Sequence, residues 1–128
     1  MAGSTLPIEL SLSIALPDGT GSAQTVVDPP NMVGPAQPGM SFVVQYISIF
    51  ARVPQGQAVQ CMINGGNAGG HWFAMFPQGA FDGFDEYVCS QLASFVIAPA
   101  GLRTFAVTRS DTAGVGNVDV HFTGVFSN

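Results

Sequence analysis

Lysine is absent from this sequence of 128 residues, and charged side chains of any kind are few. Three arginines and eight carboxylates amount to only 9% of the chain, against about 25% in typical soluble domains. A Walker-type phosphate loop needs a lysine, so the glycine-rich segment INGGNAGGHWFAMF at residues 63–76 is excluded as such a loop. The net charge of −5 predicts no nucleic-acid partner, because a phosphate backbone would be repelled.

Long apolar runs are also missing. No stretch approaches the roughly 20 apolar residues that span a bilayer, and the first residues, MAGSTLPIEL, have neither a basic start nor a long apolar segment. No asparagine begins an N-x-S/T sequon. We therefore expect a soluble chain with no membrane span, no signal peptide in the sequence as given and no N-linked glycan.

Cysteine is scarce, with only Cys61 and Cys89. Cys61 alternates with Val59 and Ile63, which is the pattern of a buried thiol on the inner face of a strand. We expect two free structural cysteines, with a disulfide between them as the alternative. A zinc site is not expected, because the cysteines and the two histidines lack the close spacing of zinc ligands.

Apolar residues are abundant by contrast, at 47% of the chain, with a mean hydropathy of +0.36. With so few charges, the surface must combine uncharged polar groups with exposed apolar ones. Such surfaces are usually covered by another subunit or by a partner. The composition therefore predicts self-association.

The local pattern alternates with period two, as in half-buried strands, and Gly/Pro turns separate the alternating segments. Ile8 to Leu16 is the clearest case. Strands are predicted at residues 8–16, 25–27, 42–53, 58–63, 71–76, 86–97 as one or two strands, 102–109 and 118–126. No segment is a convincing amphipathic helix. The prediction is an all-β, antiparallel β-sandwich, jelly-roll-like, with about eight strands in a single domain spanning residues 1–128.

The segment FVVQYISIFARV at residues 42–53 departs from simple alternation because it is apolar on both faces. This pattern predicts a central strand that is covered on both sides, by a second sheet and by a neighbouring subunit.

The last third of the chain, YVCSQLASFVIAPAGLRTFAVTRSDTAGVGNVDVHFTGVF, resembles small uncharacterised bacterial β-sandwich proteins, and the VPQGQ turn at residues 53–57 extends the resemblance. That family implies no particular activity. The closing HFTGVF at residues 121–126 is also similar to the last strand of C1q and tumour-necrosis-factor-like jelly rolls. This second resemblance implies a homo-oligomer, a trimer, formed through apolar strand faces.

The segment FDGFDEY at residues 81–87 places three carboxylates and three aromatic rings within seven positions. Hard cations bind convergent oxygens, and sugars bind an aromatic face with carboxylate acceptors. The candidate metal ligands are Asp82, Asp85 and Glu86, with calcium as the candidate cofactor, and the candidate ligand-binding residues are His71, Trp72, Asp82, Asp85 and Tyr87. The competing interpretation buries Trp72 and the loop aromatics while the acids solvate the loop.

Catalytic motifs are not found. A G-x-S-x-G nucleophile motif is missing, and a dinucleotide loop would need a helix after its glycines, where this chain has HWFAMF. We predict no enzymatic activity and no catalytic residues, with a hydrolase using His121 and Asp119 as a residual alternative. The leading hypothesis is a non-catalytic sandwich that assembles into a homo-oligomer as a structural or interaction protein. Its alternative is a lectin-like carbohydrate-binding module, with glycans as partners.

Overall fold

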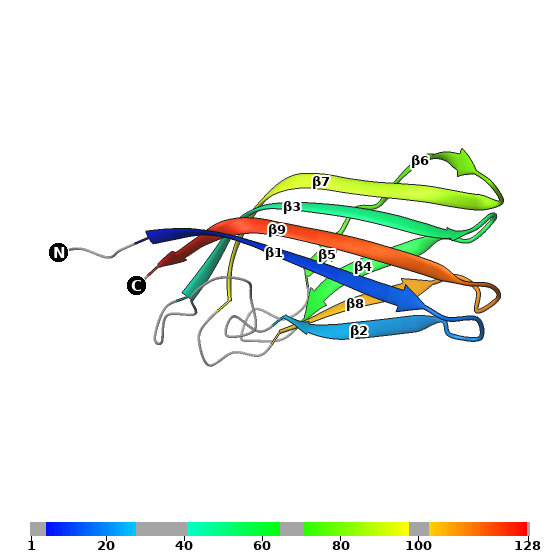
Figure 1. Cartoon of the computed structure of the whole chain (residues 1–128), viewed down its shortest axis with the longest axis horizontal. Helices are drawn as coiled ribbons and strands as arrows, with labels where there is room; N and C mark the ends of the chain where they lie inside the picture. Colours follow the sequence, from blue (N-terminus) through cyan, green and yellow to red (C-terminus); the bar gives the residue numbers. More distant parts are fainter. Residues whose placement is uncertain (1–4, 28–40, 65–70, 98–102, 128) are drawn as a thin grey trace.

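The computed structural model describes residues 5–27, 41–64, 71–97 and 103–127. These residues form two antiparallel β-sheets that pack face to face, and they contain no helix (Figure 1). The predicted all-β antiparallel sandwich is therefore confirmed, with nine strands in place of about eight. No helix in the described ranges could cross a membrane.

The nine strands divide into sheets of five and four. The five-stranded sheet contains, in spatial order, β1 (Thr5–Leu16), β9 (Gly116–Ser127), β3 (Ser41–Pro54), β7 (Phe84–Ile97) and β6 (Phe76–Phe81). The four-stranded sheet contains β2 (Ser22–Val27), β8 (Arg103–Arg109), β4 (Val59–Asn64) and β5 (His71–Phe73). The pairs β1·β9, β2·β8, β3·β7 and β4·β5 are nested within one another, as in a jelly roll, where a folded ribbon forms two sheets.

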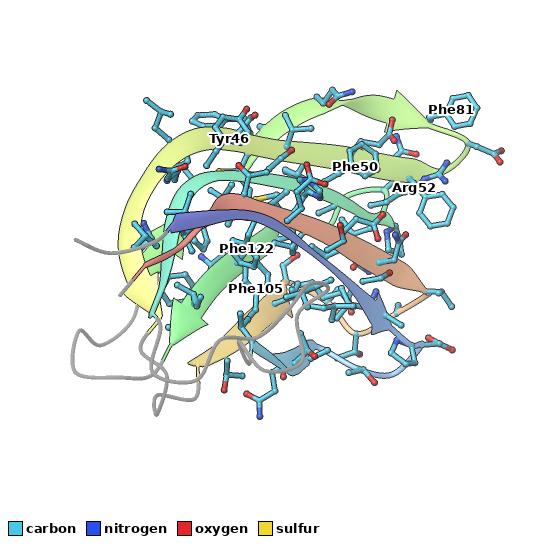
Figure 2. The ribbon with its side chains drawn as sticks, turned by 60° about the vertical axis from the view of Figure 1, so that its left-hand side comes forward. Tyr46, Phe50, Arg52, Phe81, Phe105 and Phe122 are labelled. Carbon is cyan, nitrogen blue, oxygen red and sulfur yellow. The ribbon has the colours of Figure 1, made fainter. Side chains whose placement is uncertain are left out.

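The hydrophobic core lies between the sheets and is built from the inward positions of the alternating strands. Phe105 on β8 and Phe122 on β9 meet edge to face at its centre, with ring centroids 6.1 Å apart (Figure 2). The largest fully buried side chains are Phe105, Phe122, Leu16, Ile47, Ile49, Ile63, Val27, Val44 and Val53.

Strand β3 is the middle strand of its sheet, as its sequence pattern predicts. Its inward residues, such as Ile47 and Ile49, are fully buried against the four-stranded sheet. Its outward residues, such as Tyr46 and Phe50, face away from that sheet (Figure 2). The four-stranded sheet therefore covers one face of β3, as predicted, and the predicted cover of the other face would have to come from a neighbouring subunit.

The predicted strand 71–76 is wrong in its extent. The chain leaves the four-stranded sheet after Phe73 and joins the five-stranded sheet at Phe76. Pro77, Gln78 and Gly79, which predict a turn, lie within the edge strand β6, where the register shifts between Pro77 and Gly79. A proline, which has no N–H to donate, is tolerated there because one side of an edge strand has no neighbouring strand to bond.

Four turns lie together at one end of the sandwich, which we call the turn end (residues 17–21, 54–58, 82–83 and 110–115; Figure 1). Arg109 is only 5% exposed there and donates hydrogen bonds to carbonyl groups of two of these turns and to the side chain of Gln57 in a third. Its acceptors are the carbonyl oxygens of Pro17, Thr20, Thr112, Ala113 and Gly114, at 2.8–3.3 Å, and Gln57 Oε1 at 3.3 Å. All of these acceptors are uncharged, so Arg109 is held by hydrogen bonds rather than by an ion pair.

Both cysteines are free and buried, as the favoured prediction states. Burial raises the pKa of the Cys61 thiol to about 12, and the neighbouring Cys89 adds to the shift. Burial also raises the pKa of Cys89, whose Sγ lies 3.5 Å from Gln91 Oε1. Both thiols are therefore un-ionised at neutral pH and unreactive as nucleophiles.

Candidate functional site

Trp72 is a surface residue, with 58% of its area exposed, so the interpretation that buried it in the core is wrong. It pairs with Met62 across β4 and β5 and points away from the core, because its neighbour Phe73 points inward. Trp72 lines an open pocket of about 450 Å³ at the side of the sandwich where β5 and β6 are the edge strands. Tyr87 lines the same pocket from β7, so these two predicted ligand-binding residues come together.

His71 does not join Trp72 in that pocket. Successive side chains of a strand point to opposite faces, and the His71 ring packs edge to face against Phe73, with centroids 5.0 Å apart. The glycine-rich segment 65–70 that precedes it lies outside the described residues.

The segment FDGFDEY is a tight hairpin rather than a loop. Phe81 pairs directly with Phe84, which leaves Asp82 and Gly83 as a two-residue turn with φ values of 54° and 83°. Positive φ at both positions defines a type I′ turn, and Asp-Gly is among its preferred dipeptides. Asp82 therefore forms the turn at the tip of β6 and β7, at the turn end of the molecule.

The three predicted metal ligands do not converge. Asp85 and Glu86 are adjacent in β7 and point to opposite faces of the sheet. Asp85 Oδ2 accepts a hydrogen bond of 2.9 Å from the Gly56 N–H, which fixes the β3–β4 turn. Within the ranges that the structure describes, no three His, Cys, Asp or Glu side chains gather as metal ligands. Asp82 thus forms the hairpin turn, and Asp85 fixes the β3–β4 turn. Glu86 lies on the outer face of the sheet.

The outer face of the five-stranded sheet, which points away from the core, has a polar half on β1 and β9. The Ser11 hydroxyl lies 2.8 Å from His121 Nδ1, and Glu9 Oε1 lies 3.9 Å from His121 Nε2. Asp119, the predicted partner of His121, receives instead a 3.5 Å contact from the Asn117 amide. At 3.9 Å from His121 Nε2, the Glu9 carboxylate is too distant to hold the imidazole by a hydrogen bond, as the acid of a Ser-His-acid triad does.

The other half of this face, on β3, β7 and β6, is largely apolar, with Ser48 and Ser90 as the outward polar pair between its large side chains. Leu92 is 83% exposed and lies opposite Tyr46, while Phe76 is 62% exposed and lies opposite Val88, which is itself opposite Phe50. We call these five outward side chains the apolar half-face: Tyr46, Phe50, Phe76, Val88 and Leu92. No described element lies over it (Figures 1 and 2).

Arg52 borders the apolar half-face at the turn end. Its guanidinium carbon lies 4.8 Å from the centroid of Phe84 and 5.7 Å from that of Phe81 (Figure 2). Its Nε is buried without a hydrogen-bond partner, the one such side-chain atom among the described residues. Glu86 lies directly opposite Arg52 in the β3–β7 register, yet the two form no ion pair in the described structure.

Neither Arg52 nor the apolar half-face is among the candidate site residues predicted from the sequence, although local patterns point to both. The double-sided apolar pattern of residues 42–53 marked the exposed side of β3, and Asp-Gly between two phenylalanines marked the β6–β7 hairpin. No local pattern in the sequence indicates that Arg52 and Glu86 are cross-strand neighbours, because the two residues are 34 positions apart in the chain.

No protein-family model matches this sequence, and comparison with curated proteins found no match. The solved structures that are similar in fold include the following three. A virus-like particle of the extra small virus of the giant freshwater prawn Macrobrachium rosenbergii is 14% identical, with a TM-score of 0.43, over 94% of this chain and 79% of that chain. A decameric BFDV capsid protein is 8% identical, with a TM-score of 0.43, over 98% and 99% of the two chains.

The third similar structure is infectious bursal disease virus, Gx strain, at 14% identity and a TM-score of 0.36. The match covers 98% of this chain and 36% of that one. The fold assignment rests on this chain's own strand pairing. The resemblance to bacterial and C1q-like sandwiches stays a prediction.

Proposed function

We propose that this protein is a non-catalytic β-sandwich that self-associates through the apolar half-face and acts as a structural or interaction module. The observation that carries the proposal is the exposure of Tyr46, Phe76 and Leu92 on one sheet face. Each square ångström of apolar surface that leaves water contributes about 25 cal/mol, so a second copy that covers this face gains free energy from each of these side chains.

The contrast within one sheet supports this choice of surface. Strands β1 and β9 follow the usual pattern of a solvated antiparallel sheet, with outward Ser11, Ser13, Asp119 and His121. Strands β3, β7 and β6 instead place five aromatic or aliphatic side chains outward, around the single polar pair of Ser48 and Ser90. Apolar side chains that gather on one part of a surface mark interaction sites in soluble proteins.

Light scattering coupled to gel filtration tests the proposal. At micromolar concentration we expect a mass that is a multiple of 13.3 kDa. Leu92→Glu is expected to weaken association about 100-fold, because a charge would be buried at the contact. Leu92 is exposed in the chain itself, so the variant keeps its fold.

Val115→Glu is the matched control, because Val115 is 60% exposed on the β8–β9 turn, away from the apolar half-face, and the charge change is the same. It should associate like the wild type. A wild-type monomer of 13.3 kDa, or equal dissociation of both variants, would contradict the proposal.

A second candidate function is carbohydrate binding at the open pocket of Trp72 and Tyr87. The specific observation is that the Trp72 ring is exposed at a concave site, where Gln60 and Pro77 are also lining residues. Sugars stack on such rings and hydrogen-bond to neighbouring amides. Asp82 and Asp85 line no part of this pocket, so we expect binding that does not require calcium.

A glycan array tests this candidate. We expect hits that survive a chelator and that Trp72→Ala weakens about tenfold or more, through loss of the stacking surface. Val115→Ala, a truncation of another exposed apolar side chain, should leave the hits unchanged. An array without hits, at high chain concentration and with calcium supplied, would count against a lectin role.

A further inference from the structure

We propose that the self-associating copies are related by a twofold axis that passes between Arg52 and Glu86, so that each Arg52 pairs with Glu86 of the partner subunit. This inference rests on the proposed self-association and names the contact that orients it. It predicts an isologous dimer as the basic unit, with two identical ion pairs at the turn end of the interface.

The first support is the unsatisfied state of Arg52. Its guanidinium is stacked on Phe81 and Phe84, which hold it in place without supplying an acceptor. Its Nε is buried and has no hydrogen-bond partner. A guanidinium that is fixed and desolvated on one side binds a carboxylate with a smaller loss of side-chain entropy than a free one.

The second support is charge complementarity on the same surface. Glu86 projects from the outer face beside Arg52, and in the described structure its carboxylate has neither a hydrogen bond nor an ion pair. Asp82 at the hairpin tip adds a further exposed carboxylate. In a chain with only three arginines, the half-face thus has one unpaired cation next to unpaired anions.

The third support is symmetry. A twofold interface brings the same patch of both copies together, so residue i meets residue j and j meets i. Directly opposed strand neighbours lie about 5 Å apart at Cβ. An axis that lies in the interface, parallel to the strands and midway between Arg52 and Glu86, therefore places opposite charges over each other and like charges apart. The same rotation lays the adjacent apolar half-faces against each other.

Charge reversal tests the pairing. The association constant of the full chain is measured by sedimentation equilibrium for wild type, Arg52→Glu, Glu86→Arg and the double variant. Each single variant opposes like charges at both contacts, so we expect association about tenfold or more weaker. The double variant restores opposite charges and is expected to return within about threefold of wild type.

Glu9→Arg is the matched control, because it makes the same substitution as Glu86→Arg on edge strand β1 of the same face, where the rotation brings no strand of the partner over it. It should associate like the wild type. Circular dichroism checks that each variant keeps the sheet signal, and Glu86→Arg decides the matter if Arg52→Glu fails to fold.

The outcomes separate the two proposals. Weakened single variants with a restored double variant support the pairing. An oligomeric wild type whose single variants are unchanged, or whose double variant is not restored, overturns the pairing and leaves self-association intact. A wild-type chain that stays monomeric at about 100 μM overturns both self-association and the pairing. The apolar half-face would then bind a different partner.

Discussion

Replacing Arg109 by methionine is expected to lower the free energy of unfolding by about 3–5 kcal/mol, because it leaves acceptors from three turns without their donor. Methionine fills a similar apolar volume, so the loss reports hydrogen bonds rather than a cavity. The carbonyl groups of Pro17, Thr112 and Gly114 all bond to one nitrogen, Nη2, at 2.8–3.0 Å. Urea titration followed by circular dichroism, at one fixed chain concentration, measures the change.

Arg109→Lys distinguishes geometry from charge. Lysine keeps the positive charge, but it replaces the planar guanidinium and its five N–H donors by a single ammonium nitrogen with three. One nitrogen cannot reach the acceptors of all three turns. We expect this variant to lose about 2 kcal/mol or more. Full stability of the lysine variant, or a loss of less than about 1 kcal/mol in the methionine variant, would show that the turns do not depend on this network.

Truncating Phe122 to alanine is expected to cost about 3–5 kcal/mol, through lost apolar burial and the cavity that remains. The ring is fully buried and meets Phe105 of the opposite sheet edge to face, so the truncation removes a contact between the two layers. Phe122→Leu, which keeps most of the volume, should cost about 1.5 kcal/mol or less. Chemical denaturation gives both values.

Val115→Ala serves as the control for this truncation. Its side chain is 60% exposed, and substitutions at such positions usually change stability by about 0.5 kcal/mol or less. If Phe122→Ala cost no more than the control, the Phe105–Phe122 contact would not be the centre of the core.

The faces of the strands were predictable from the sequence, because a period of two is a local property. In β9, Val118, Val120 and Phe122 point inward and Asp119 points outward, as the alternation predicts. The central position of β3 followed in the same way from its double-sided apolar pattern. Alternation does not report which sheet a strand joins, and for that reason strand 71–76 was predicted as one piece.

The candidate site was predicted only in part, for the same reason. Trp72 and Tyr87 lie in different sheets and meet because the chain crosses between β5 and β6. The carboxylates were grouped by their closeness in sequence, whereas the pleat of β7 sends Asp85 and Glu86 to opposite faces. A single domain over residues 1–128 and the absence of catalysis remain predictions.

By itself the sequence determined the all-β class, the buried thiols and the excess of apolar surface, since each depends on composition or on neighbours two positions apart. Only the tertiary structure decided the partners of Arg109, the exposure of Trp72 and the side of the sheet left uncovered. These features depend on contacts between residues far apart in the chain, such as Arg109 with Pro17, which share no local pattern. Long-range strand pairing brings such residues together, and it is specified by the whole fold rather than by any one segment.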